Sequence, residues 1–73
     1  MNTIRLPLMP ENYYGSFPVV TNLKVGDVLY IGPPLTCEEM IIQSLTQDLN
    51  NLVIKTDKSI LVADSITRVN RKG

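Results

Sequence analysis

The chain contains no histidine and no tryptophan, and Cys37 is its single cysteine. Histidine is the usual general base and the commonest metal ligand, so its absence removes the Cys–His and Ser–His pairs that activate a nucleophile. One cysteine cannot form an intrachain disulfide, and we interpret Cys37 as a small, semi-buried apolar residue. Gly-rich phosphate loops and paired-cysteine motifs are also absent. We therefore expect no catalytic residue, no metal site and no cofactor, and a protein that is not an enzyme.

Long apolar segments are missing as well. No run approaches the ~20 residues that a helix needs to cross a bilayer. The first apolar pieces are short and are interrupted by Pro7 and Pro10, unlike those of a signal peptide. We expect a soluble protein without membrane contact, in the cytoplasm or within a particle assembled there. A chain of 73 residues forms one domain with a thin core, and such small domains often associate with a partner protein or with copies of themselves.

The formal net charge is zero, but the charges are unevenly distributed. Residues 1–64 hold four basic and all seven acidic residues, a balance of −3, whereas residues 65–73 hold three basic residues and no acid, a balance of +3. Domains that bind nucleic acid are usually basic overall, so this distribution is only weakly typical of them. The candidate nucleic-acid-binding residues are Tyr30, Arg68, Arg71 and Lys72. The alternatives are barrel packing for Tyr30 and a solvated basic tail over residues 71–73.

Residues 1–22 differ from the rest of the chain, since they contain three prolines and three of the four aromatic residues. Proline fixes φ and removes a backbone donor, which excludes a helix or a central strand here. The segment is nevertheless too apolar for a solvated tail. We call it the arm, and two alternatives stay open: it wraps its own domain, or it lies on another subunit. In the second case the expected partner-binding residues are Leu6, Leu8, Met9, Tyr13, Tyr14 and Phe17.

Residues 23–70 predict a small all-β domain. Strands are expected near 28–31, 39–47, 51–56, 59–63 and 67–70, because turn residues separate β-rich runs. The turns are Val25-Gly26-Asp27, Gly32-Pro33-Pro34, Asn50-Asn51 and Asp57-Lys58, and a short 3₁₀ turn capped by Asp64 or Ser65 is expected at 64–66. The expected core consists of Val28, Leu29 or Tyr30, Ile42, Val53 or Ile54, Val62, Ile66 and Val69.

The stretch TCEEMIIQSL, residues 36–45, allows two interpretations. Thr36 and Glu39 match a capping box, and Ile41, Leu45 and Leu49 recur at four-residue steps, which together indicate a helix over 37–49 and an α+β fold. The same residues also suit a long strand with apolar groups on both faces, as in a strand that bends across a small barrel. We favour the strand because the surrounding segments are all of β type.

The order of turns and strands resembles that of the SH3-like small barrels, the broad group that includes the KOW, Tudor and Sm-like modules. The resemblance rests on LKVGDVLYI (23–31), IIQSLTQDLNNLVIKT (41–56) and SILVADSITRV (59–69). It implies a five-stranded barrel and excludes the arm. The aromatic cage of Tudor domains and the histidine-bearing RNA-binding motif of Hfq are absent, so the resemblance assigns no site residue.

Two kinds of function fit these observations. The first is a non-enzymatic structural or adaptor subunit that docks into a larger protein assembly, or associates with itself, through the arm. Phage-particle decoration or connector proteins and small subunits of multiprotein complexes have this plan, by analogy. The second is an Sm- or KOW-like barrel that binds nucleic acid, whose binding would weaken with added salt.

Overall fold

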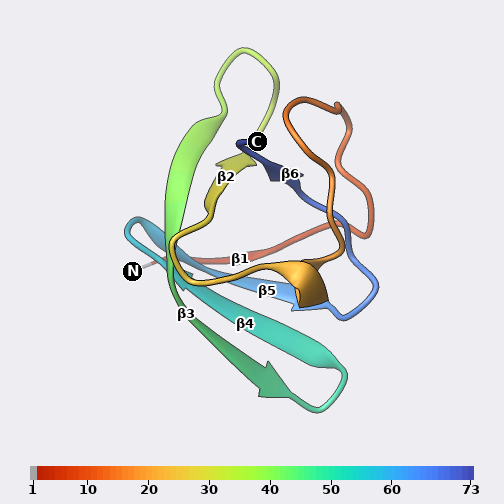
Figure 1. The fold of residues 1–73 in the computed structure, drawn as a ribbon, viewed down its shortest axis with the longest axis vertical. Helices are drawn as coiled ribbons and strands as arrows, with labels where there is room; N and C mark the ends of the chain where they lie inside the picture. Colours follow the sequence, from red (N-terminus) through yellow and green to blue (C-terminus); the bar gives the residue numbers. More distant parts are fainter. Residues whose placement is uncertain (1) are drawn as a thin grey trace.

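A computed structural model describes residues 2–73, which form one curled six-stranded sheet in the order β1-β5-β4-β3-β2-β6 (Figure 1). The strands are β1 (Asn2–Arg5), β2 (Val28–Ile31), β3 (Glu38–Asp48), β4 (Asn51–Thr56), β5 (Ser59–Asp64) and β6 (Asn70–Arg71), and a 3₁₀ turn, η1 (Val20–Asn22), precedes β2. Neighbouring strands are antiparallel, except that β1 runs parallel to β5. The prediction of a small all-β, barrel-like domain is confirmed, but the sheet has six strands instead of the expected five, because residues of the arm form β1.

The stretch with two interpretations is a strand, so the helix over 37–49 is wrong. β3 pairs with β2 along Glu38–Ile41 and with β4 along Ile42–Asp48, and the register shifts between Ile42 and Ser44. A bulge of this kind bends a strand and changes which side chains face inward. Met40 and Ile42 are buried before it, and Leu45 packs against the core after it. The bulge therefore allows even-numbered residues before it and odd-numbered Leu45 after it to face the same core, which is why the apolar residues do not alternate strictly along β3.

The core combines residues of the sheet with residues of the arm. Leu29, Ile42, Ile54 and Val69 are buried as predicted. Three expected core residues are not in the buried set, since Val28 and Val62 are half-buried and Ile66 is 67% exposed. The complete buried cluster is Leu6, Val20, Leu23, Leu29, Met40, Ile42, Ile54, Leu61, Ala63 and Val69.

Most of the predicted strand positions are confirmed, and the last one is corrected. The strand expected at 67–70 is the two-residue β6, Asn70–Arg71, preceded by a single β-bridge between Arg68 and Val19. Residues 65 and 66 form an ordinary turn, in which Asp64 accepts hydrogen bonds from the N–H groups of Ile66 and Thr67. The residues expected to be a solvated basic tail belong partly to the sheet, because Arg71 lies in β6 and Lys72 donates its N–H to the Val28 carbonyl at 2.8 Å.

Candidate functional site

The arm lies on its own domain. Ser16 and Arg71 exchange two main-chain hydrogen bonds, at 2.7 and 2.9 Å, and Val20 donates its N–H to the Thr67 carbonyl at 2.8 Å. Leu6 and Val20 are buried in the core. Of the two alternatives for the arm, the structure shows the one in which it wraps its own domain. Leu6 is therefore a buried core residue and not part of the exposed surface of the arm.

Part of the arm still directs apolar side chains to solvent. Leu8 is 52% exposed, Met9 is 50% exposed and Tyr13 is 64% exposed. The ring of Tyr13 packs on that of half-buried Phe17, with centroids 4.4 Å apart. We refer to Leu8, Met9, Tyr13 and Phe17 as the arm surface. Its side chains are held by a folded backbone, so a partner would meet a preformed surface.

Arg68 supports this surface from the C-terminal segment. Its guanidinium lies 5.9 Å from the centre of the Phe17 ring and donates a 3.1 Å hydrogen bond to the Phe17 carbonyl. Its N–H also donates to the Leu8 carbonyl at 3.0 Å. Arg68 thus joins both ends of the arm surface, which gives this residue a structural role next to the exposed aromatic pair.

Tyr14 and Tyr30 contact each other. Their rings meet edge to face with centroids 5.2 Å apart. A hydrogen bond with the Cys37 thiol, with a smaller contribution from desolvation, raises the pKa of Tyr14 above its ordinary value. Asn70 fixes the backbone beside this pair, because its side-chain amide accepts from the Tyr14 N–H at 3.1 Å and donates to the Asn12 carbonyl at 2.8 Å. Tyr14 and Tyr30 therefore have partners within the domain, whereas Tyr13 has its ring largely in solvent.

The C-terminal basic residues are engaged in different places. The Arg71 guanidinium lies 3.6 Å from the Asp27 carboxylate, and the Lys72 ammonium lies 3.1 Å from the Glu39 carboxylate. The hydrogen bond to Glu39 is the main reason why the pKa of Lys72 is raised. Arg68 is held against Phe17. Two of the three cations thus have an acidic neighbour, which lowers the positive potential that a phosphate backbone would meet.

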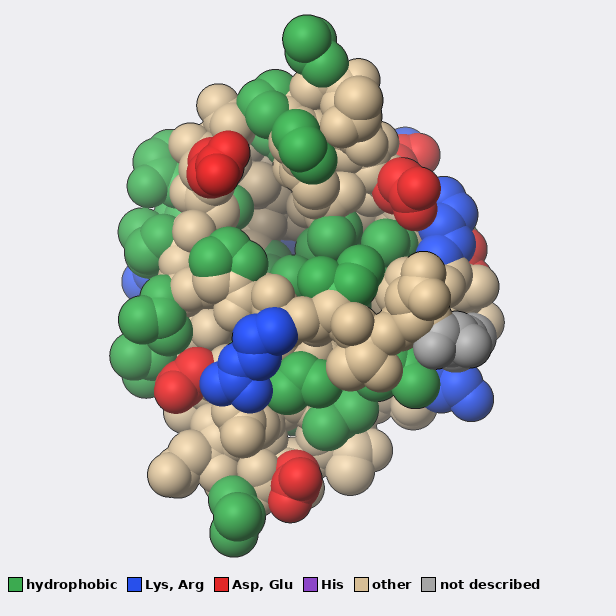
Figure 2. Space-filling view, turned by 180° about the vertical axis from the view of Figure 1, so that it is seen from behind, with side chains coloured by type: hydrophobic (Ala, Val, Ile, Leu, Met, Phe, Trp, Pro, Cys, Tyr) green, Lys and Arg blue, Asp and Glu red, His purple; other side chains and the backbone are tan. Residues whose placement is uncertain are grey.

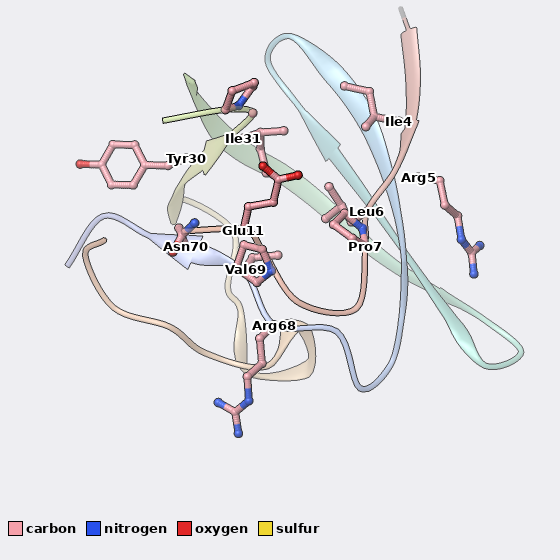
Figure 3. A pocket seen from close by; sticks show the side chains of 13 residues that line it. Ile4, Arg5, Leu6, Pro7, Glu11, Tyr30, Ile31, Arg68, Val69 and Asn70 are labelled. Carbon is pink, nitrogen blue, oxygen red and sulfur yellow. The ribbon is translucent and has the colours of Figure 1, made fainter. Parts of the chain in front are cut away.

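A cavity of about 270 Å³ lies between β1 and the β2–β6 part of the sheet. Figure 3 shows Ile4, Leu6 and Pro7 on one side of the cavity, Ile31 and Val69 on the other, and the Glu11 side chain between them. Arg5 and Arg68 also line the cavity, and their guanidinium groups point away from its centre (Figure 3). Figure 2 shows hydrophobic side chains around a hollow in the middle of one face of the domain.

Within residues 2–73, no three His, Cys, Asp or Glu side chains come together in a way that could hold a metal ion. In the same part of the chain, no helix is long and apolar enough to cross a membrane. The charged residues and the amide that line the cavity are Glu11, Arg5, Arg68 and Asn70, and they come from the arm and the C-terminal segment rather than from a shared motif.

Comparisons with known proteins identify no relative of this chain. No protein-family model matches the chain, and neither the curated proteins nor the solved structures contain a significant match. The class of protein is therefore defined by the fold alone, as a small all-β domain with a curled sheet.

The sequence signalled some of these site residues and missed others. Tyr13 and Phe17 were identified from the density of aromatic residues in the arm, and the structure places them together. Asn70 was missed, because an asparagine at the end of a predicted strand carries no sign that its side chain binds a segment 58 positions away. Ile4 and Ile31 were also missed as cavity residues. They are far apart in the sequence, and only the curl of the sheet brings them together.

Proposed function

We propose that this protein is a non-catalytic structural or adaptor subunit of a larger protein assembly, and that it docks on another protein through the arm surface. The observation that carries the proposal is the exposure of Leu8, Met9 and Tyr13 on a segment whose backbone is fixed to the sheet. Fully burying a large apolar side chain contributes about 1.5–3 kcal/mol, so about half of this remains available at each of the three positions. A rigid surface loses little conformational entropy when it binds.

The partner expected for this surface is a protein with an apolar patch and a pocket for an aromatic side chain. Tyr13 is the expected anchor, because aromatic residues contribute most to interface energies and because its ring is already oriented by Phe17. A decoration or connector protein of a phage particle, or a small subunit of a multiprotein complex, is the setting that we propose. Binding of nucleic acid is less well supported, since Arg71 and Lys72 already have acidic neighbours.

The test compares a triple variant and a double variant of a tagged chain. One carries Leu8→Ser, Met9→Ser and Tyr13→Ser on the arm surface, and the control carries Leu35→Ser and Leu49→Ser, which remove leucines that are 98% and 88% exposed elsewhere. Complexes formed in the source cells are purified, and their stoichiometry is measured by native mass spectrometry. We expect a complex of fixed stoichiometry that the arm-surface variant loses and the control keeps. A complex that survives the arm-surface substitutions in a folded variant would show that another surface docks.

A further inference from the structure

β1 leaves one of its edges without a neighbouring strand among residues 2–73, because it lies at the end of the strand order. Leu6 donates its N–H to the Val62 carbonyl at 2.9 Å, and Ile4 lies opposite Leu61. In a parallel ladder, the main-chain groups of successive residues point alternately to one side and to the other. The N–H and C=O groups of Ile4 and Leu6 therefore face β5, and those of Thr3 and Arg5 face the free edge.

The apolar cavity lies beside this edge. Ile4 belongs to β1 and Leu6 follows directly after it, and both line the cavity opposite Ile31 and Val69 (Figure 3). Its volume of about 270 Å³ is below the range of roughly 300–1,000 Å³ that is usual for sites of whole small molecules. The space suits a few apolar side chains. A free strand edge next to such a space is the arrangement that binds extended peptides by strand addition, in which main-chain hydrogen bonds give affinity and alternate side chains enter pockets.

The charges beside the edge indicate which segment would fit. Arg5 is exposed and hydrogen-bonds to the neutral side chain of Asn51 at 3.2 Å, and no carboxylate lies within ion-pair distance of it among residues 2–73. An acidic residue opposite Arg5 on an added strand would form a cross-strand ion pair. Glu11 lines the cavity and has the opposite effect, since its carboxylate disfavours an acidic side chain at the inward positions.

We propose that the free edge of β1 and the adjoining cavity bind an extended segment of another protein as a seventh strand of the sheet. The segment carries apolar residues at the positions that face the cavity and an acidic residue at the intervening position beside Arg5. This site is separate from the arm surface and extends the docking function beyond it. β1 of a second copy fits less well, because Asn2–Arg5 contains no acid to pair with Arg5.

The test uses the ¹⁵N- and methyl-labelled full chain and the synthetic peptide acetyl-Ser-Val-Asp-Ile-Thr-Val-Ser-amide, followed by NMR. We expect saturable shifts of the Thr3 and Arg5 amides and of the methyl groups of Ile4, Ile31 and Val69. Three control peptides separate the contributions. Two of them are N-methylated at alternate residues, one at the odd positions and one at the even positions; the peptide whose methyl groups face β1 should give no shifts, whereas the other should bind as the unmodified peptide does. Replacement of Asp by Lys should weaken binding by about 1.5- to 5-fold, the factor expected for one cross-strand ion pair.

Two variants at position 5 separate the contribution of the side-chain charge to peptide binding from that of the main-chain N–H group. Arg5→Gln and Arg5→Pro both remove the guanidinium, but only Arg5→Pro removes the N–H at the free edge, where proline is tolerated in edge strands. Arg5→Gln should weaken binding by about 1.5- to 5-fold and Arg5→Pro should abolish it. Slow exchange of the Leu6 amide in both variants would show that β1 stays paired with β5. Tyr13→Ser changes an arm-surface residue that does not line the cavity, and it should bind the peptide as the unmodified chain does, so failure of this test can be distinguished from failure of the proposed function.

Several results would overturn the strand-addition site. These are the absence of saturable shifts up to millimolar peptide, shifts confined to residues away from β1 and the cavity, and equal binding of the N-methylated peptides. Changes in the same amide signals on dilution of the chain without peptide would show that a second copy occupies the edge instead. If Arg5→Pro does not fold, the N-methylated peptides decide the question on the unmodified chain.

Discussion

Gly15 approaches the carbonyl group of Arg71 so closely that a Cβ atom at Gly15 would overlap the oxygen. Gly15 also has a φ of 73°, in the region that residues with a side chain rarely adopt. The neighbouring Ser16 exchanges main-chain hydrogen bonds with the same Arg71. This contact fixes the arm, and with it the arm surface, on the last strand of the sheet.

Substitution of this glycine should detach the arm. Gly15→Ala introduces both the strain of a positive φ and the overlap with Arg71, whereas Gly26→Ala introduces only the strain, since Gly26 has a φ of 98° and open space around it. We expect Gly26→Ala to lower the free energy of unfolding by about 1–2 kcal/mol and Gly15→Ala to lower it by more. Urea unfolding measures both, and hydrogen exchange of the Ser16 amide should accelerate in Gly15→Ala alone. Equal losses would show that the arm is held elsewhere.

Two buried threonines should respond in opposite ways to the same substitution. The Thr56 hydroxyl donates to the Ser59 carbonyl at 2.7 Å and accepts from the Ser59 and Lys58 N–H groups. The Thr67 hydroxyl is equally buried and has no hydrogen-bond partner in the described part of the chain. Thr56→Val should cost about 1–3 kcal/mol because it leaves main-chain groups of the β4–β5 turn unsatisfied. Thr67→Val should be neutral or stabilising, since it removes a buried polar group that makes no bond.

Thermal unfolding of the two valine variants is the measurement. For a domain of this size, a change of 1 kcal/mol corresponds to a shift of roughly 4–8 °C in the melting temperature, which is easily resolved. A loss at Thr67 as large as that at Thr56 would mean that the Thr67 hydroxyl is hydrogen-bonded in solution.

Substitution by aspartate at two neighbouring positions of β5 should distinguish the buried face of this strand from its half-buried face. Leu61 is fully buried, whereas its neighbour Val62 is half-buried on the opposite face of the strand. Leu61→Asp should unfold the domain, because an unpaired buried carboxylate costs several kcal/mol against a small total stability. Val62→Asp should remain folded, with a smaller loss, since its carboxylate can reach water. Circular dichroism and the dispersion of amide signals report the outcome, and a folded Leu61→Asp protein would reverse the face assignment.

A substitution in the turn between β3 and β4 should increase the stability of the domain. Leu49 has a φ of 56° and is 88% exposed, so its side chain adds strain without contributing much burial. Leu49→Gly should raise the free energy of unfolding by about 0.5–1 kcal/mol, because glycine relieves more strain than it costs in chain entropy. Leu35→Gly is the control, since Leu35 is also exposed but does not have a positive φ. A gain in both variants would point to the removal of an exposed leucine rather than to the relief of strain.

The strands were predictable where turn residues separate them, and the faces were predictable only where one face is apolar. Gly32-Pro33-Pro34, Asn50-Asn51 and Asp57-Lys58 mark the ends of β2 to β5 closely. In β5 the run from Ile60 to Ala63 is apolar at every position, so the alternation that decides the inward face is absent. The pairing of β5 with both β4 and β1 decides it instead, and this information is not local.

The burial of individual residues in the arm could not be predicted from the local sequence either. Its apolar character indicated that it must be buried, but not by what. Leu6 and Leu8 flank Pro7 and look alike in the sequence, yet one is in the core and the other is half-exposed. The difference arises because Leu6 is hydrogen-bonded to β5 and continues the alternation of β1, whereas Leu8 has left the strand.

The pairing of Ser16 with Arg71 joins residues 55 positions apart, and the contact of Asn12 with Asn70 spans 58. Contacts of such long sequence separation form late, because the entropy of closing the intervening loop is lost before they stabilise the chain. We therefore expect the arm to settle only after the 67–71 segment has been placed beside β2. The arm surface would then exist only on a finished domain, and a partner that recognises it would select completely folded copies for assembly.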